Sequence, residues 1–316
     1  MNEPSSAYRS AAPTRRGVHD RLAAATLSAE PGRPGAAASG YTAGRTLSLR
    51  VEIARQLRRR RTQVIALILL LLPVVIALAF EVGGTGNSSQ AQNGAALTSL
   101  ATTGAGNFAL FTEFVAVGFL LVVMVALFCG DTVASEASWS SLRYLLALPV
   151  PRSRLLRQKF TVALIFSIGA NVLLPLWGYV VGGLFFGWDP ARSPISGEFS
   201  TGVTLQRLAI VVGYATGQAL LVAALAFWLS VVTDAPLGAV GGATFLVVIS
   251  NILDAITALG NYRTLLPTHF QYSWLDALGP AVVWDDMLRG TGVALVYSSL
   301  FLLLAWRHFL TKDITS

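Results

Sequence analysis

Long apolar runs separated by short polar segments make up most of the chain after residue 61. An α-helix needs about 20 predominantly apolar residues to cross the hydrocarbon core of a bilayer. Six runs approach or exceed this length, and they predict membrane-spanning helices over residues 62–80, 107–129, 160–188, 205–232, 237–256 and 291–306. The pattern therefore predicts an all-α integral membrane protein whose transmembrane domain covers residues 62–310.

The first 61 residues show two other patterns. Residues 1–46 are rich in Ala, Gly, Ser, Pro and Arg and lack apolar periodicity, which is typical of a disordered tail. Residues 47–61 predict an amphipathic elbow helix, because Leu49, Ile53 and Leu57 recur every four residues and share one face. The last four residues of this segment are all basic: Arg58, Arg59, Arg60 and Arg61. Such a helix suits a membrane surface, with its arginines toward anionic headgroups. An ordinary cytoplasmic helix is the alternative.

Basic residues are distributed unevenly among the segments that flank the predicted spans. Of the 23 lysines and arginines, 19 lie in residues 1–61, 130–159 and 307–316. Cytoplasmic segments carry such an excess, so both termini are predicted to be cytoplasmic, with residues 311–316 as a short tail.

Residues 257–290 connect the last two predicted spans on the external side. The segment is partly apolar and contains Trp274 and Trp284. Tryptophan is enriched where a membrane meets water. We expect this segment to be half-buried in the outer leaflet, with its tryptophans at headgroup level.

Composition supports the membrane class and narrows the chemistry. Hydrophobic residues make up 54% of the chain and charged residues only 12%, against about 25% in soluble domains. Most basic residues precede or flank a predicted span, where such residues hold a cytoplasmic segment in place. We therefore expect the lipid bilayer as a partner and no nucleic acid. We expect no metal site, because Cys129 is the only cysteine and the three histidines are far apart.

The connection over residues 130–159 predicts a short helix on the cytoplasmic side. Ser140 can cap its first turn, since a serine side chain accepts a hydrogen bond from an otherwise unpaired backbone amide. Pro149 ends it, because proline cannot continue helical hydrogen bonding. The helix is apolar, with Leu142, Leu145 and Leu146. An apolar helix in the cytoplasm needs a surface to bury against, and a groove on a partner protein would provide one.

This connection resembles the corresponding loop of the type 2 ABC exporter permeases. In that family the loop has an acidic residue, a pair of small residues, a leucine-rich helix, a proline stop and a basic turn that ends in lysine. The matching residues here are Glu136, Ser140, Ser141, Arg143, Leu145, Leu146, Pro149, Arg152 and Lys159. One departure is that the family usually has Gly-Thr where this chain has two serines. The resemblance extends over about residues 47–316.

The resemblance implies a permease subunit of an ATP-driven exporter in the plasma membrane of a bacterium. A coupling helix at residues 140–149 would dock in a cleft of an ATPase. The ATPase-coupling residues would be Glu136, Ser140, Ser141, Leu142, Arg143, Leu145, Leu146, Pro149 and Arg152. The exporter would contain two ATPase subunits and a second permease copy or paralogue, and it would work by alternating access.

ATP hydrolysis is expected on the partner, together with the ATP and magnesium that it needs. A Walker A motif requires a lysine directly after a glycine, because that lysine must reach the nucleotide phosphates. The two lysines of the chain, Lys159 and Lys312, follow Gln158 and Thr311. The chain is therefore predicted to be a transport subunit with no catalytic residue or cofactor of its own.

Four polar residues within the predicted spans are candidates for a translocation pathway: Glu113, Asn171, Gln218 and Asn251. A carboxylate such as Glu113 is costly at membrane depth unless it is paired, hydrated or protonated. It could line a central cavity and meet cationic substrates, or it could reach headgroups or a packing partner. Hydrogen bonding between helices is the alternative role for the amides.

Three glycine pairs with the spacing G-x-x-x-G lie in the predicted spans: Gly178 and Gly182, Gly213 and Gly217, and Gly238 and Gly242. Because glycine lacks a side chain, such pairs let two helices approach closely. Packing within one subunit and contacts between two permeases are both compatible with this pattern.

Two other functions also fit a polytopic membrane protein. An ion-coupled secondary transporter often has internal repeats and charged groups near the midplane, but no repeat is evident here and Glu113 is the one deep carboxylate. An intramembrane enzyme would need a constellation of His, Asp or Ser at membrane depth, and His269 has no obvious partner in the sequence. The exporter permease is therefore the leading hypothesis.

Overall fold

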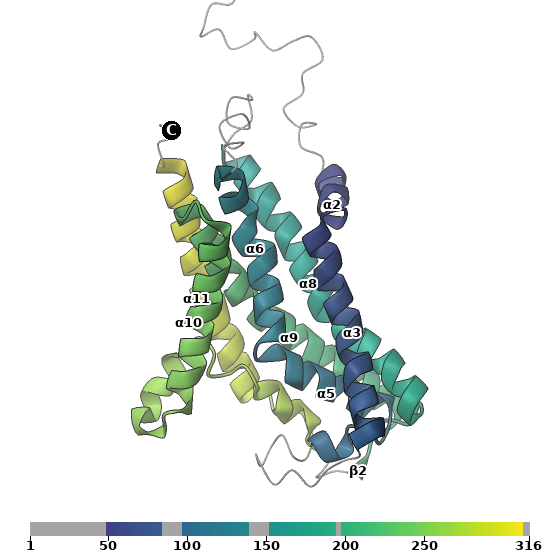
Figure 1. Cartoon of the computed structure of the whole chain (residues 1–316). Coiled ribbons are helices and arrows are strands. Elements are labelled where there is room, and N and C mark those ends of the chain that lie inside the picture. Colours follow the sequence, from purple (N-terminus) through teal and green to yellow (C-terminus); the bar gives the residue numbers. More distant parts are fainter. Residues whose placement is uncertain (1–48, 84–96, 139–151, 194–196, 312–316) are drawn as a thin grey trace, which may run out of the picture. The chain divides into compact units, whose positions relative to one another are not determined.

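The computed structural model describes residues 49–83, 97–138, 152–193 and 197–311. Among these residues, six helices are long and apolar enough to cross a membrane. They are α3 (Arg60–Gly83), α6 (Leu120–Ser138), α8 (Arg152–Phe186), α9 (Thr201–Val232), α10 (Pro236–Ala255) and α11 (Asp285–Thr311), and they form one bundle (Figure 1). The prediction of an all-α, multi-pass membrane protein with six spans is confirmed.

Local sequence signals explain where several helices begin. The Ser200 side chain accepts a hydrogen bond from the backbone amide of Val203, so it caps the first turn of α9. Pro236 occupies the start of α10, where its missing N–H has no helical partner to lose. A two-residue antiparallel pair, β1 (Arg192–Ser193) with β2 (Gly197–Glu198), joins α8 to α9. The sequence pattern did not predict these two short strands.

The second predicted span, residues 107–129, is two helices in the structure. A helix labelled α5 (Ala105–Val117) ends before Gly118, and α6 begins at Leu120. The Gln271 side chain donates a hydrogen bond of 3.0 Å to the Val117 carbonyl, which the break leaves without a helical partner. Gly118 is needed there, because a Cβ at this position would lie 2.5 Å from the Tyr272 hydroxyl. The expectation of one continuous helix was wrong, because a distant segment enters the bundle at this point.

A short helix, α2 (Leu49–Leu57), precedes α3 and corresponds to the predicted elbow helix over residues 47–61. None of its residues is buried, and the apolar side chains of Leu49 and Leu57 are exposed. It lies at the same end of the bundle as the last turn of α6 and the first turn of α8 (Figure 1). We call this end the arginine end, because Arg55, Arg59 and Arg61 lie there.

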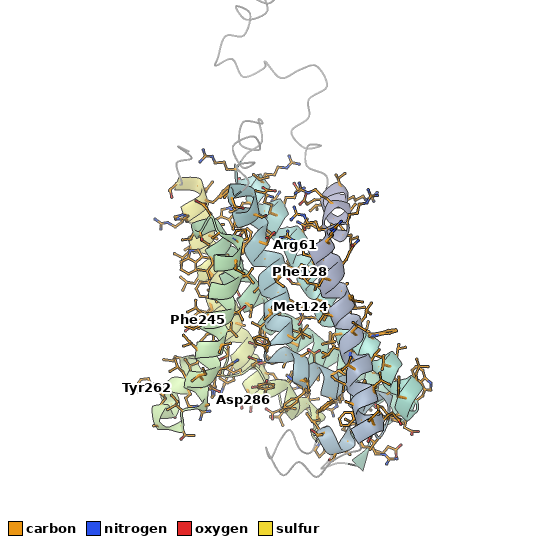
Figure 2. The ribbon with its side chains drawn as sticks, viewed as in Figure 1. Arg61, Met124, Phe128, Phe245, Tyr262 and Asp286 are labelled. Atoms are coloured by element: carbon orange, nitrogen blue, oxygen red, sulfur yellow. The ribbon has the colours of Figure 1, made fainter. Side chains whose placement is uncertain are left out.

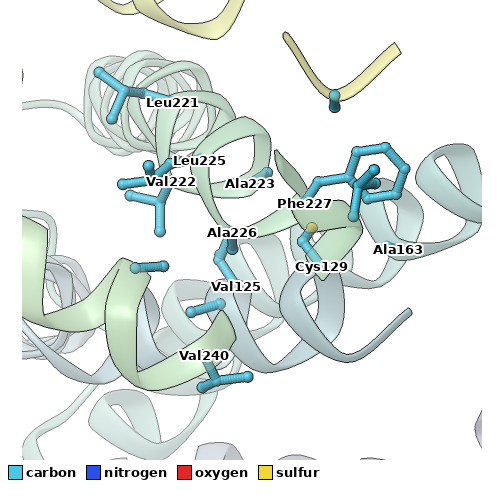
Figure 3. Packing of buried hydrophobic residues seen from close by; sticks show 14 of the residues in the cluster. Val125, Cys129, Ala163, Leu221, Val222, Ala223, Leu225, Ala226, Phe227 and Val240 are labelled. Carbon is cyan, nitrogen blue, oxygen red and sulfur yellow. The ribbon is translucent and has the colours of Figure 1, made fainter. Parts of the chain in front are cut away.

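Helix α9 lies at the centre of the bundle, and α6, α8, α10 and α11 all pack against it. The main apolar core is built on its Leu221–Val231 portion. Phe227 is fully buried there beside Cys129 of α6 and Ala163 of α8 (Figure 3). Burying these side chains against one another holds the spans in one arrangement, because interiors of this kind are close-packed.

The segment between α10 and α11 contains two 3₁₀ helices, η1 (Thr257–Leu265) and η2 (Ser273–Leu278). Trp274 in η2 is 0% exposed and packs in a core cluster with Leu110, Val211 and Tyr214. Trp284 is 48% exposed. Trp274 is therefore buried inside the protein, because η2 packs against α9, whereas Trp284 is exposed. The position of both tryptophans at headgroup level stays a prediction.

The glycine pairs differ in what surrounds them. A Cβ on Gly182 would lie 2.7 Å from the Phe108 Cβ, and one on Gly178 would lie 2.5 Å from the Thr112 hydroxyl, so this pair lets α8 approach α5 closely. Among the described residues, no atom lies within 4 Å of a Cβ on Gly213 or Gly217. Gly238 and Gly242 have ordinary or slightly tight contacts, at 3.5 Å to Ala235 and 3.3 Å to Leu229.

Substituting Gly182 tests whether this close approach matters. Gly182→Val is expected to destabilise the protein by about 1–3 kcal/mol, because the new side chain would be forced against Phe108. The measurement is the unfolding midpoint of the detergent-purified protein. Gly217→Val is the matched control and is expected to change stability by less than about 0.5 kcal/mol. A larger effect at Gly217 than at Gly182 would instead assign the close helix contact to a second subunit.

Candidate functional site

A buried ion pair lies at the arginine end. The Lys159 Nζ atom of α8 is 2.5 Å from the Glu136 Oε1 atom of α6, and the two side chains are only 8% and 9% exposed. The residues flank the connection over 139–151 on either side. The pair therefore holds together the two helix ends from which that connection leaves the bundle, with charge-assisted hydrogen bonding at short range.

Helix α2 joins this network through Arg55. The Arg55 guanidinium lies 3.4 Å from the Glu136 carboxylate and 2.7 Å from that of Glu52. One turn and a half deeper in α6, Asp131 pairs with Arg61 and lies 3.6 Å from Arg59. Two carboxylates of α6 thus contact arginines of α2, of the residues after it and of the first turn of α3.

These charges surround an open groove of about 710 Å³ at the arginine end. Its basic lining consists of Arg55, Arg59, Arg60 and Arg61, and its acidic lining consists of Asp131 and Glu136. Burial, and next the nearby charge of Arg55, lower the pKa of Arg59. The groove lining contains four arginines and two carboxylates. This excess of positive charge favours an acidic surface or an anion next to the groove.

Most of the predicted coupling residues lie outside the described residues: Ser140, Ser141, Leu142, Arg143, Leu145, Leu146 and Pro149. Arg152 is the exposed first residue of α8. Glu136 lies in the network described above. The role of Lys159 as the partner of Glu136 is an addition from the structure, since the sequence showed only the end of a basic turn.

A partly open cavity of about 40 Å³ is lined by residues of α5, α6, α8, α9 and α10 and of the segment that precedes η2. Its walls are mainly apolar, but Asn171, Gln218, Thr268 and Gln271 also line it. Among the described residues, the buried Gln218 Nε2 atom has no hydrogen-bond partner. One water needs roughly 10–15 Å³ of such space, so the cavity can hold a small water cluster that satisfies this amide.

The cavity brings together two of the four predicted pathway residues, Asn171 and Gln218. Asn251 is partly exposed and lies outside the cavity lining. Thr268 and Gln271 were missed by sequence reasoning, because they belong to a segment between spans, where polar residues are ordinary.

Glu113 is 0% exposed in α5, one helical turn before Val117, which lines the cavity. Neither of its carboxylate oxygens has a hydrogen-bond partner among the described residues. A carboxylate buried in this way is unfavourable when charged.

His269 has a partner in the structure. Its Nδ1 atom lies 2.5 Å from the Asp254 Oδ1 atom, and the Arg263 Nε atom lies 3.4 Å from the same oxygen. No partner for His269 was evident in the sequence, because Asp254 lies in the last turn of α10 and the histidine follows η1. The cluster ties the end of α10 to the segment after η1. Among the described residues, no group of three or more His, Cys, Asp or Glu side chains could hold a metal ion.

Comparison with known proteins identifies a family. The family model described as "Protein of unknown function (DUF2705)" matches residues 95–315. The match covers the helices from α5 to α11 and includes Glu136 and Lys159. No curated protein matches the chain.

Proposed function

The chain belongs to the DUF2705 family of proteins of unknown function, and from its own site we propose that it is the membrane-spanning permease subunit of an ATP-driven ABC exporter. A separate ATPase would supply ATP hydrolysis, with ATP and magnesium bound to that partner. The arginine end would face the cytoplasm of a bacterium, in keeping with the excess of basic residues there.

One observation carries the proposal, namely the buried Glu136–Lys159 pair at the two flanks of the 139–151 connection. A helix that transmits force must be joined rigidly to the spans that it moves. The ion pair joins α6 and α8 at the base of the connection, and Arg55 adds α2. A partner that displaced the connection would therefore act on α6 and α8 together, because a charge-assisted contact of 2.5 Å joins the two helices.

The small cavity fits a closed state of such a permease. At about 40 Å³ it admits water only, whereas binding sites for small molecules measure roughly 300–1,000 Å³. Alternating access would widen it toward one side of the membrane at a time. Asn171 and Gln218 would then offer hydrogen bonds to a substrate along an otherwise apolar path.

Replacing Leu145 and Leu146 together by glutamate tests the proposal. Two carboxylates placed against an apolar groove lose solvation, so we expect co-purification of a Walker A-containing ATPase to fall by more than about tenfold. The measurement is quantitative mass spectrometry of the affinity-purified protein from its native host, together with the ATP hydrolysis of the complex. Leu310→Glu, at an exposed position near the end of α11, is the matched control and is expected to retain the ATPase.

Wild-type protein that brings down no such ATPase would contradict the exporter hypothesis. The alternative, an ion-coupled secondary transporter, is favoured by one observation: Glu113 is fully buried and has no hydrogen-bond partner in the part of the chain that the structure describes. Transport by the reconstituted chain alone that needs a proton gradient and is lost in Glu113→Gln would establish that alternative.

A further inference from the structure

An apolar groove of about 510 Å³ lies between η1 and the first half of α11, at the end of the bundle opposite the arginine end. Its lining includes Leu265, Phe270, Gly292, Val293 and Val296. Gly292 keeps the groove open, since no described atom lies within 4 Å of a Cβ at that position. The volume is in the range of small-molecule sites, roughly 300–1,000 Å³.

Aromatic side chains near the groove indicate how it would lie relative to the membrane. Tyr262 in η1 and Trp284 just before α11 are both exposed, as expected of aromatic side chains at the interface. Tyr262 and Asp286 lie at the end of the bundle away from Arg61 (Figure 2). A rise of 1.5 Å per residue places Arg289 about 7 Å and Val296 about 18 Å from Trp284 along the axis of α11. The mouth would therefore lie at headgroup level and the floor in the acyl region.

Charged side chains of both signs lie at or near the mouth: Arg289 belongs to the groove lining, whereas Asp285 and Asp286 lie beside it at the start of α11. Arg289 lines the groove, and its side chain is 73% exposed. Asp286, 52% exposed, lies 3.6 Å from it, and Asp285 is the exposed first residue of α11. A guanidinium binds phosphate oxygens well, and carboxylates bind an ammonium group. The cationic and anionic groups therefore match a headgroup that contains one phosphate and one ammonium.

We propose that this groove binds one phospholipid with a zwitterionic, ethanolamine-type headgroup. An acyl chain lies in the groove past Gly292 and Val296, the phosphate contacts Arg289, and the ammonium contacts Asp285 and Asp286. Within the bilayer an acyl chain fills an exposed apolar groove at little cost, since lipid surrounds it on all sides. This assignment is independent of whether the chain is a permease.

Native mass spectrometry of the detergent-purified full chain tests the proposal, with phosphatidylethanolamine and phosphatidylglycerol of identical acyl chains as probes. Wild-type protein is expected to retain phosphatidylethanolamine at least about fivefold better than phosphatidylglycerol. Gly292→Leu fills the groove and is expected to reduce this retention by about fivefold or more. Gly241→Leu is the matched control, because Gly241 also has no described atom within 4 Å of its Cβ position but lies on α10. It is expected to bind like wild type.

Charge variants separate the headgroup from the acyl chain. Asp285→Asn with Asp286→Asn is expected to remove the preference for phosphatidylethanolamine, while Arg289→Gln is expected to weaken both lipids. Equal retention of both lipids by wild type, or undiminished retention by a Gly292→Leu protein with normal unfolding midpoint, would overturn the proposal. A dimeric wild type together with a monomeric Gly292→Leu protein would also overturn it, because the groove would then hold a second copy of the chain.

Discussion

Glu136→Leu is expected to lower the free energy of unfolding by about 3–5 kcal/mol, the range observed when one partner of a buried ion pair is removed. The substitution leaves the Lys159 ammonium 8% exposed and without its carboxylate. It also removes the contact of that carboxylate with Arg55. The measurement is the unfolding midpoint of the purified protein in detergent, with ATP hydrolysis by the complex as a second readout.

Two comparisons separate this effect from a general response to the loss of a carboxylate. Glu198→Leu removes a half-exposed partner of Arg192 at 3.6 Å, and exposed pairs contribute about 0–1 kcal/mol. The double variant Glu136→Leu with Lys159→Met is expected to be more stable than Glu136→Leu alone, since no unpaired ammonium remains buried. Similar losses for Glu136→Leu and Glu198→Leu would show that the α6–α8 pair does not hold the flanks of the 139–151 connection together.

Trp274→Ala is expected to destabilise the protein by about 3–5 kcal/mol, as is usual when a large aromatic side chain is removed from a core. Trp274 is 0% exposed and packs with Leu110, Val211 and Tyr214, so its removal leaves a cavity that the helices cannot easily fill. The same unfolding measurement applies. Hydrogen exchange of the η2 backbone is also expected to become faster.

Trp284→Ala is the matched control for this prediction. Trp284 is 48% exposed, and substitutions at such positions usually change stability by less than about 0.5 kcal/mol. Equal effects at the two tryptophans would indicate that both lie on the membrane surface, as the sequence pattern suggested. That outcome would contradict the packing of η2 against α9.

Arg207 explains why η2 stays against α9. Its guanidinium is buried and donates hydrogen bonds to the Ala277 carbonyl at 2.7 Å and the Pro280 carbonyl at 3.3 Å. Two helical turns further along α9, the Tyr214 hydroxyl donates a hydrogen bond of 2.6 Å to the Phe270 carbonyl. The Phe270 carbonyl also accepts a hydrogen bond of 3.1 Å from the Ser273 backbone amide. Pairing backbone groups in this way is a condition for irregular chain at membrane depth.

The sequence by itself determined the number of spans and the approximate position of all but the second, which was predicted at residues 107–129 and lies at Leu120–Ser138. In lipid, a helix satisfies its own backbone hydrogen bonds, so the length of an apolar run is sufficient to predict a span. The positions of α9 and α10 follow from this rule within a few residues, and Asn171 and Gln218 were identified as polar groups within spans.

Only the tertiary structure decided the features that depend on contacts between distant residues. An apolar run looks the same whether it is continuous or broken, so the end of α5 at Val117 depended on Gln271, 154 residues away. A tryptophan between two spans is typical of the membrane interface. The segment that contains Trp274 instead packs against α9, where Arg207 and Tyr214 donate hydrogen bonds to its backbone. The pairing of Glu136 with Lys159 likewise required α6 and α8 to lie side by side. Periodicity reports which residues avoid water, whereas the partner of each buried polar group is set by how the helices pack.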